Sequence, residues 1–506
     1  MGHADGLQHL AADRLLPLSF RFVVVALAFV ACAPRSEPPP VPSRGPSVVE
    51  SAVLRAALDV ERERWSRERR ERQLDAVDPG ELIEHSRRHH QLQIDAREVD
   101  VAKIFQQGET LFERRFTPPE GLGFGRAVDR GLTRVEGPAM GPDAMSCVEC
   151  HHRGGDDGAG EQHQRAWLGG DGRRLSTAQP RVALHLAGLG LVQLLAAEMT
   201  RDLQQRREQV VSQPGDSTRF ELVSKGVSFG TLVVRDGGLD LSEVVGVDAD
   251  LVVRPFGWKG AHATLRTFVR AALPQHMGLE PLPLPADGGA FADIESKPWL
   301  HDEDQDQVAG ELHEGQLTSM AVYLALLDVP QVRPPVAADL REAWGRGAVV
   351  FGELGCAECH RPTLPLQGHA WVERGEGRDA GLAIDLIADV QVPPALEQRD
   401  YARPLEVALF SDLRRHDLGP ELATAAVDGG VAPRLFLTRP LWGLGTRGNA
   451  YLHDGRARTI ADAVLAHGGE AAGVREKWKA ASEGDRAAVG IYLLSLRRQP
   501  MARLQP

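Results

Sequence analysis

The chain has 506 residues, with 58 basic and 70 acidic side chains and a net charge of −12. This length gives room for about three domains of ordinary size. An apolar fraction of 42% excludes a globally disordered chain, and the acidic balance argues against a nucleic-acid partner. Five cysteines are too few for a disulfide scaffold, so their positions in the chain carry the information.

The N-terminus has the pattern of an export signal. An uninterrupted apolar run covers residues 22–31, which is too short to span a bilayer but suits a signal peptide. Cys32 follows a small residue, as in the lipobox of bacterial lipoproteins, although Phe29 stands where Leu is usual. We therefore expect a periplasmic protein with a signal peptide over residues 1–32 and a lipid anchor on Cys32. The alternative is ordinary cleavage that removes Cys32 with the signal.

Two segments of unusual composition come next. Residues 33–48 are rich in proline and predict an extended tether. Residues 49–95 are rich in charge, with Glu and Arg four residues apart, and predict a solvated helical segment. Together with a lipid on Cys32, they would hold the rest of the protein close to a membrane.

The other four cysteines lie in two C-x-x-C-H motifs, the signature of c-type haem attachment. Two thiols on one tight turn can bond the two vinyl groups of one porphyrin, and the adjacent histidine then lies under the iron. We therefore expect two covalently bound haem c groups. The residues that would bind them are Cys147, Cys150, His151, Cys356, Cys359 and His360.

A zinc site built from both cysteine pairs and a dithiol redox motif are the alternatives. Zinc would require two pairs that are far apart in the sequence to converge. Neither alternative explains why a histidine follows each pair, at His151 and at His360. Haem attachment explains every residue of both motifs and agrees with export.

An internal repeat surrounds the two motifs. Before each motif a segment carries Gly and Phe, and after it an amphipathic segment carries Tyr. This order predicts a mainly α fold of two cytochrome c-like haem domains, over residues 96–330 and 336–506. Short β-branched stretches in residues 219–256 predict that a small β insertion enlarges the first domain. The matching residues are Gly108, Phe112 and Tyr323 in the first copy and Gly347, Phe351 and Tyr492 in the second.

Further segments carry a family resemblance. They are residues 116–123 and 255–259 in the first half, and 410–419, 438–445 and 451–459 in the second. Together they resemble the di-haem oxidoreductase family, labelled thiol oxidoreductase, which is related to the bacterial di-haem cytochrome c peroxidases. The Tyr-x-His-Asp-Gly-Arg block is the most specific element shared with the peroxidases.

The resemblance implies that His151 and His360 are the proximal haem ligands. It also places His467 where the peroxidases carry a distal Met and the enzyme that matures a tryptophylquinone carries Tyr. We therefore expect His467 to be the distal ligand of the second haem. A bis-His haem has a lower potential than a His/Met haem, because the softer thioether favours reduced iron.

The sixth ligand of the first haem has three candidates. His163 follows a glycine-rich stretch that resembles the loop of the peroxidases, whereas His276 and Met277 follow an expected helix. The catalytic acid/base carboxylate has no candidate in the sequence. A Ca²⁺ ion between the two domains is a further expectation.

The resemblance favours an enzyme over a carrier. One haem would reduce hydrogen peroxide, and the other would pass on electrons from a small redox protein. A non-catalytic di-haem electron-transfer protein, with both irons six-coordinate, is the alternative. Oxidation of another substrate is a third interpretation, because fold and motif do not fix a substrate.

Overall fold

The structure is a computed structural model, and the residues that it describes all belong to one compact unit, Pro46–Pro506. The signal peptide, Cys32, the tether and His163 lie outside the described residues. The described ranges are 91–123, 142–152, 158–160, 166–168, 177–212, 219–235, 238–281, 311–375, 381–387, 404–448 and 450–498.

The helices of the described residues include long, capped elements as well as single turns. The α-helices are α3 (Gln91–Asp95), α4 (Val101–Glu113), α5 (Cys147–Cys150), α6 (Leu189–Val211), α7 (Leu265–Met277), α9 (Glu314–Ala325), α10 (Ala338–Glu353), α12 (Ile460–Ala466), α13 (Ala472–Ala480) and α14 (Glu483–Leu494). The 3₁₀ turns are η1 (Pro118–Glu120), η4 (Cys356–Glu358) and η5 (Gly469–Ala471).

Short antiparallel strands are spread along the chain and pair as six small sheets in the described residues. They pair as β1–β2, β3–β4–β5, β6–β13, β7–β10, β8–β9 and β11–β12. The strands are β1 (Ala166–Leu168), β2 (Gln179–Arg181), β3 (Arg219–Ser224), β4 (Val227–Arg235), β5 (Gly238–Asp240), β6 (Gln331–Val332), β7 (Leu364–Leu366), β8 (Ala370–Glu373), β9 (Leu382–Asp385), β10 (Leu405–Val407), β11 (Arg415–Asp417), β12 (Leu435–Leu437) and β13 (Leu496–Arg497).

This distribution corrects the predicted fold class. The protein has a mixed α/β fold, and the prediction of a mainly α fold of two cytochrome c-like domains is wrong. Strands of two to four residues are too short to show a period of two in the sequence, so most of them gave no pattern. The insertion does contain the predicted hairpin, as β3 and β4, but Leu251 has a left-handed φ of 59° and its β-branched neighbours form no strand.

Side-chain caps explain where several helices begin. The Asp100 carboxylate accepts a hydrogen bond from the backbone N–H of Ala102 at the start of α4. At α14, the Ser482 hydroxyl accepts from the N–H of Asp485. Such caps satisfy backbone donors that the first helical turn leaves without partners.

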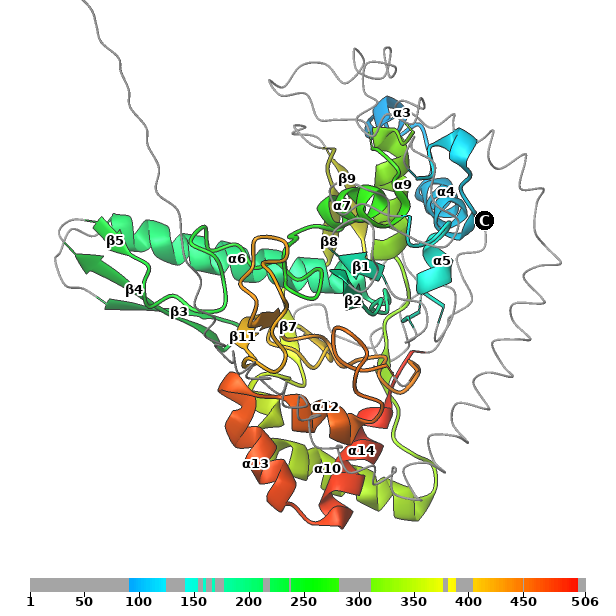
Figure 1. The fold of residues 1–506 in the computed structure, drawn as a ribbon. Helices are drawn as coiled ribbons and strands as arrows, with labels where there is room; N and C mark the ends of the chain where they lie inside the picture. The colour runs from blue at the N-terminus through cyan, green and yellow to red at the C-terminus, as the bar shows by residue number, and fades with distance from the viewer. Residues whose placement is uncertain are drawn as a thin grey trace, which may run out of the picture. The chain divides into compact units, whose positions relative to one another are not determined.

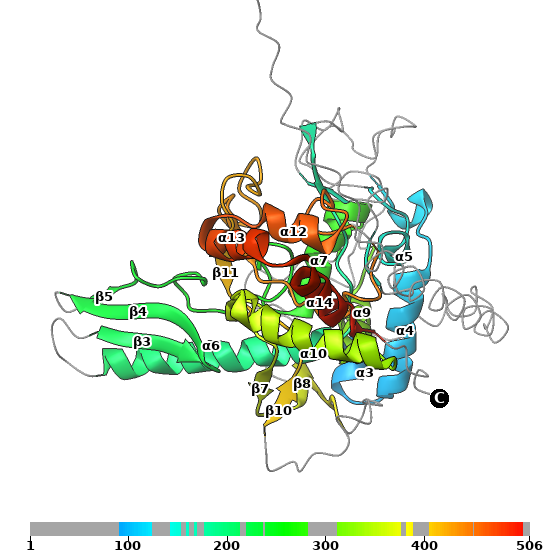
Figure 2. The same cartoon turned by 90° about the horizontal axis from the view of Figure 1, so that it is seen from below.

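The internal repeat appears as two pairs of packed helices, α4 with α9 and α10 with α14 (Figures 1 and 2). Each pair meets at a glycine. A Cβ atom on Gly108 would lie 2.0 Å from the carbonyl oxygen of Ser319, and one on Gly347 would lie 2.0 Å from that of Ala488. Only glycine lets the two backbones approach this closely.

The aromatic residues around each glycine repeat as well. In the first pair, the rings of Phe105 and Phe112 lie 5.1 and 5.3 Å from the ring of Tyr323. In the second pair, three aromatic rings form the matching contacts. The Tyr492 ring lies 5.9 Å from Trp344 and 5.7 Å from Phe351. The same packing unit therefore precedes and follows each C-x-x-C-H motif.

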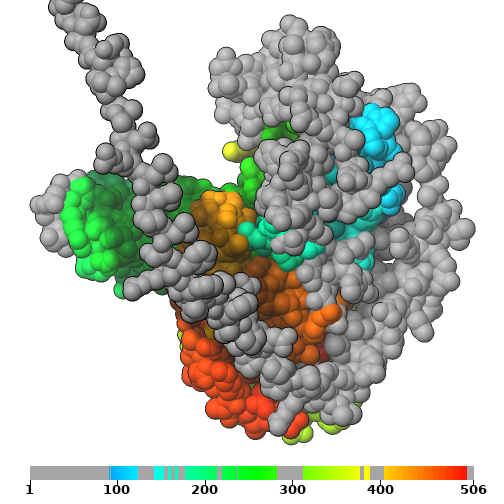
Figure 3. Space-filling model, viewed as in Figure 1, coloured from blue at the N-terminus to red at the C-terminus, as the bar shows by residue number. Residues whose placement is uncertain are grey.

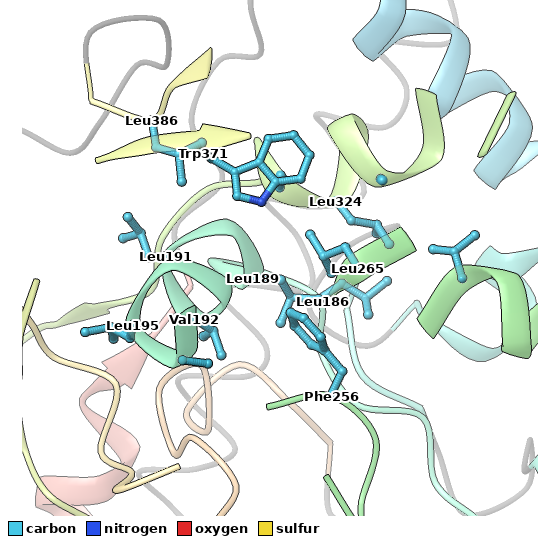
Figure 4. Close-up of a cluster of buried hydrophobic side chains, with 14 of the residues drawn as sticks. Leu186, Leu189, Leu191, Val192, Leu195, Phe256, Leu265, Leu324, Trp371 and Leu386 are labelled. Atoms are coloured by element: carbon cyan, nitrogen blue, oxygen red, sulfur yellow. The ribbon is translucent and has the colours of Figure 1, made fainter. Parts of the chain in front are cut away.

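The larger hydrophobic core lies around the N-terminal half of α6. Figure 4 shows Leu189, Val192 and Leu195 of this helix packed with side chains from other elements, among them Trp371 of β8 and Leu265 of α7. Trp371 and Leu265 are fully buried. This core therefore joins elements that precede and follow the second motif in the sequence.

The β3–β4–β5 sheet packs along the other half of α6 (Figure 1). A buried ion pair between Lys225 and Glu198 holds its turn against the helix. Glu198 also accepts hydrogen bonds from the backbone N–H groups of Gln367 and Gly368. In Figure 3 the segment that contains β11 lies beside this sheet, where Arg414 donates to the carbonyl oxygen of Ser228.

None of the helices in the described residues is both long and apolar enough to cross a bilayer.

Candidate haem sites

Each cysteine pair lies on one tight turn. Cys147 and Cys150 form α5, and Cys356 opens η4. The backbone N–H of each motif histidine donates to the carbonyl oxygen of the first cysteine, at 3.0 Å in the first motif and 2.9 Å in the second. The turns therefore place both thiols and the histidine of each motif together, as attachment to one porphyrin requires.

The four motif cysteines are free thiols. Burial raises the pKa of Cys147 and Cys150 to about 12 and the pKa of Cys356 to about 11. Their side chains nevertheless keep some accessible surface. Neutral thiols that are desolvated but not packed into the core suit a site that receives an apolar macrocycle.

A single zinc site that joins both cysteine pairs does not form. Within the described residues, one group of at least three potential ligand side chains occurs, and it consists of Cys359, Asp412 and His416. It includes neither cysteine of the first motif. Its thiol and imidazole also differ from the all-oxygen set that Ca²⁺ prefers, so it gives the expected Ca²⁺ ion no support.

Both motif histidines are oriented by backbone carbonyl groups. The Nδ1 atom of His151 lies 2.8 Å from the carbonyl oxygen of Leu184, and Nδ1 of His360 lies 3.2 Å from that of Phe410. A carbonyl oxygen can only accept, so Nδ1 carries the proton and Nε2 keeps its lone pair. This is the orientation in which a histidine binds a metal through Nε2.

His467 lies beside the second motif. It caps the C-terminus of α12, and its Nδ1 lies 2.6 Å from the carbonyl oxygen of Ala463. Burial lowers the pKa of His467, whereas burial and the nearby charge of His467 together lower the pKa of His360 to about 4. Both rings have Nδ1 held by a backbone carbonyl oxygen, which leaves Nε2 of each with its lone pair. The role of His467 as the distal ligand remains a prediction.

The other predicted ligands have different surroundings. Nδ1 of His276 lies 3.0 Å from the carboxylate of Asp143, which also accepts from the backbone N–H of Trp167. Met277 is buried in the larger hydrophobic core. His163 lies outside the described residues. The role of each as a sixth ligand remains a prediction.

The Tyr-x-His-Asp-Gly-Arg block connects the two halves of the chain. The carbonyl oxygen of His453 accepts from the backbone N–H of Val182, two residues before Leu184. Burial lowers the pKa of His453 to about 4, and its ring lies 4.8 Å from that of Phe436. Asp454 pairs with Arg456.

Sequence analysis did not single out His416. Its Nε2 lies 2.8 Å from the Asp412 carboxylate, and its Nδ1 lies 2.8 Å from the Glu470 carboxylate. Nδ1 also lies 3.9 Å from the sulfur of Cys359. Burial opposes a charge here, but the hydrogen bonds and charges of Asp412 and Cys359 raise the pKa of His416 to about 10. Only the i, i+4 spacing of Asp412 and His416 could have suggested the pair.

Sequence analysis also missed a group at the junction of the two halves, which consists of His185, Arg439 and Arg447. The ring of His185 lies in van der Waals range of Gly443, since a Cβ on that glycine would lie 3.4 Å from the ring. Burial, followed by the charges of Arg447 and Arg439, lowers the pKa of His185 to about 3. His185 is far from the two arginines in the sequence, so no local pattern predicts the group.

The two motifs share one local geometry, with each histidine held by a backbone carbonyl group. Residues 251–496 match the family described as "Di-haem oxidoreductase, putative peroxidase". The match confirms the resemblance found in the sequence. It contains the second motif and begins after the first.

Other comparisons add little. A solved structure of Kuenenia stuttgartiensis hydrazine synthase, pressurized with 20 bar xenon, shares 19% sequence identity with the chain. The similarity covers 36% of this chain and 55% of the other, with a TM-score of 0.22. The chain therefore spans about half the length of that protein, and a TM-score this low supports no argument. No curated protein matches the chain.

Proposed function

We propose that the protein is an exported di-haem c-type oxidoreductase that reduces peroxide at one haem with electrons passed through the other. One observation carries the proposal: the two motif histidines have the same orientation, and among the described residues a second histidine, His467, lies near enough to His360 to lower its pKa. The match of residues 251–496 to the di-haem oxidoreductase family supports redox chemistry.

In this proposal the chain attaches and orients two haem groups. The paired thiols of each motif form thioethers, and Nε2 of His151 and of His360 provides the proximal ligands. The carbonyl oxygens of Leu184 and Phe410 keep each ring in one tautomer. Bound haem iron supplies the one-electron chemistry of the reaction.

The two haem sites would have different roles. His467 would fill the sixth position at the second site, which suits electron transfer because a fixed ligand pair changes little with oxidation state. The first site would keep a position that a small oxidant can reach. Reduction of hydrogen peroxide to two water molecules takes two electrons and two protons, and a small redox protein would supply the electrons.

The N-terminal pattern supports the proposed location. An export signal and a lipid on Cys32 would place the protein in the periplasm and tether it to a membrane. Covalent haem attachment takes place outside the cytoplasmic membrane, so the C-x-x-C-H motifs and the export signal are consistent. Mass spectrometry of the mature N-terminus tests whether Cys32 is present and acylated.

Electron paramagnetic resonance of the oxidised protein, with and without hydrogen peroxide, tests the proposal. The expected result is one low-spin bis-His signal and one high-spin signal that peroxide consumes. Two low-spin signals that do not change when peroxide is added would contradict the proposed peroxidase activity. They would identify the protein as the alternative, a non-catalytic electron carrier. A pyridine haemochrome assay gives the haem content, for which we expect two haem groups per chain.

A further inference from the structure

The junction between the two halves contains two half-buried arginines for which the described residues provide no carboxylate partner. In the part of the chain that the structure describes, neither Arg439 nor Arg447 forms an ion pair with a carboxylate. Burial, with the charge of Arg447 added, lowers the pKa of Arg439 to about 9. Burial also lowers the pKa of Arg447. Each guanidinium group lies over an aromatic ring, Arg439 over Trp258 and Arg447 over Tyr451, but a ring does not neutralise the charge, so an anionic partner is expected.

The hydrogen bonds of the two arginines leave donors unused. Nη1 of Arg439 donates to the carbonyl oxygens of Pro255 and Gly257, but its Nε is buried without a partner among the described atoms. Nη2 of Arg447 donates to the carbonyl oxygen of Ala450 at 2.7 Å. Both guanidinium groups are therefore fixed by backbone acceptors and still have N–H groups to offer.

Two aromatic side chains at the junction also have buried nitrogen atoms without partners. Within the described residues, no hydrogen-bond partner exists for Nδ1 of His185 or for Nε1 of Trp442. Arg498, whose charge also reaches His185, differs because Asp328 neutralises it, with its carboxylate 2.8 Å from Nε. Nε of Arg439 and Nε1 of Trp442 are both N–H donors, so an oxyanion would satisfy them.

We propose that Arg439, Arg447 and Trp442 form a carboxylate-binding site beside His185, and that it holds the propionate groups of haem. Guanidinium groups bind carboxylates through paired N–H···O contacts, and haem carries two carboxylates at one edge. His185 directly follows Leu184, whose carbonyl oxygen orients the proximal ring of His151. We therefore assign the site to the first haem. A small anionic substrate has the same chemistry and is the competing source.

This inference rests on the proposed binding of two haem groups, and the experiment separates the two claims. The full-length protein, with its haem attached, is compared with its Arg447→Gln and Arg439→Gln variants. Arg434→Gln is the matched control, because Arg434 lies in the same segment, is exposed and pairs with Asp417. Haem content is measured first, and a wild-type protein with no haem would overturn the proposed function itself.

Redox titration then tests the site. Loss of a positive charge beside the propionates favours oxidised iron, so the midpoint potential of the first haem should fall. We expect at least a tenfold shift in its ratio of oxidised to reduced forms, which corresponds to about 59 mV for one electron. The second haem and the Arg434→Gln protein should change little. Arg447→Lys should restore part of the potential, because lysine keeps the charge.

Two results would overturn the assignment. Unchanged potentials in variants that retain two haem groups would exclude the propionates. Acetate and formate are then added to the wild type and to the variants, and the haem spectrum and thermal unfolding are recorded. A response of the wild type that Arg447→Gln abolishes, with unchanged potentials, would identify a free small carboxylate as the occupant and overturn the haem assignment.

Discussion

The two motif regions share their packing and differ in what faces the histidine. In both, an aromatic residue, a glycine and a phenylalanine of one helix pack on the tyrosine of another, and a carbonyl group holds Nδ1 of the motif histidine. The second region adds His467 and the carboxylate pair around His416. The first region lies next to the cationic junction of Arg439 and Arg447. The two regions therefore repeat one packing unit and differ in the residues that lie around the motif histidine.

Removal of either cysteine pair should have the largest effect. Replacement of Cys147 and Cys150 by Ala, or of Cys356 and Cys359 by Ala, should reduce the haem content from two groups per chain to one, because thioether bonds need both thiols. Pyridine haemochrome absorbance and the intact mass measure the content. A variant that keeps both covalent haem groups would contradict the assignment of its motif.

The next test concerns His467 and the asymmetry of the two sites. His467→Ala should convert the second haem from low spin to high spin, because the iron loses its sixth ligand. Electron paramagnetic resonance of the oxidised protein records the change, and added imidazole should restore the low-spin signal. His369→Ala is the control, because His369 pairs with Asp385 and is not a candidate ligand of either haem. An unchanged low-spin signal in His467→Ala would show that another residue binds the iron.

The glycines at the helix crossings test whether the two packing units are equivalent. Gly108→Ala and Gly347→Ala should each lower the free energy of unfolding by about 3 kcal/mol or more, since the new Cβ would overlap a carbonyl oxygen at 2.0 Å. Chemical denaturation of the holoprotein measures the effect.

Gly345 provides a control within the same helix as Gly347. A Cβ on Gly345 has no atom within 4 Å, so Gly345→Ala should raise stability by about 0.5–1 kcal/mol through the higher helix propensity of alanine. Equal effects of Gly345→Ala and Gly347→Ala would contradict the close approach of α10 and α14. A large loss at only one of Gly108 and Gly347 would show that the two packing units are not equivalent.

The sequence predicted the residues that recur locally, and it failed where contacts are long-range. The period of the apolar residues predicted the helices that became α9 and α14, and the repeat predicted the positions of Gly108 and Gly347. The fold class was wrong because strands such as β7 and β10 contain three residues each and pair across a long stretch of chain. A local window contains too little of such a pair to reveal it.

The candidate sites follow the same rule. The motif cysteines and histidines were visible because haem chemistry fixes their spacing, and His467 followed from the resemblance. His185 and Arg447 are far apart in the sequence. They come close only in the folded protein, where the charge of Arg447 lowers the pKa of His185. Trp344 was also missed, although it precedes Gly347 by the same interval as Phe105 precedes Gly108. A comparison of the two copies residue by residue could have found it.

The last prediction concerns the pH dependence of stability in the second region. Because the pKa of His416 is raised to about 10 in the folded protein, its charged form contributes stability that is complete below about pH 6.5 and is lost as the pH rises toward 10. Thioether formation at Cys359 removes part of that shift, whereas Asp412 and Glu470 remain. His416→Gln should therefore destabilise the holoprotein by about 2 kcal/mol at pH 6 and by less at pH 10. Urea unfolding at both pH values measures this difference, with Glu421→Gln, an exposed carboxylate that pairs with Arg475, as the control. A loss of stability that is equal at both pH values would mean that His416 acts by packing and not by its charge.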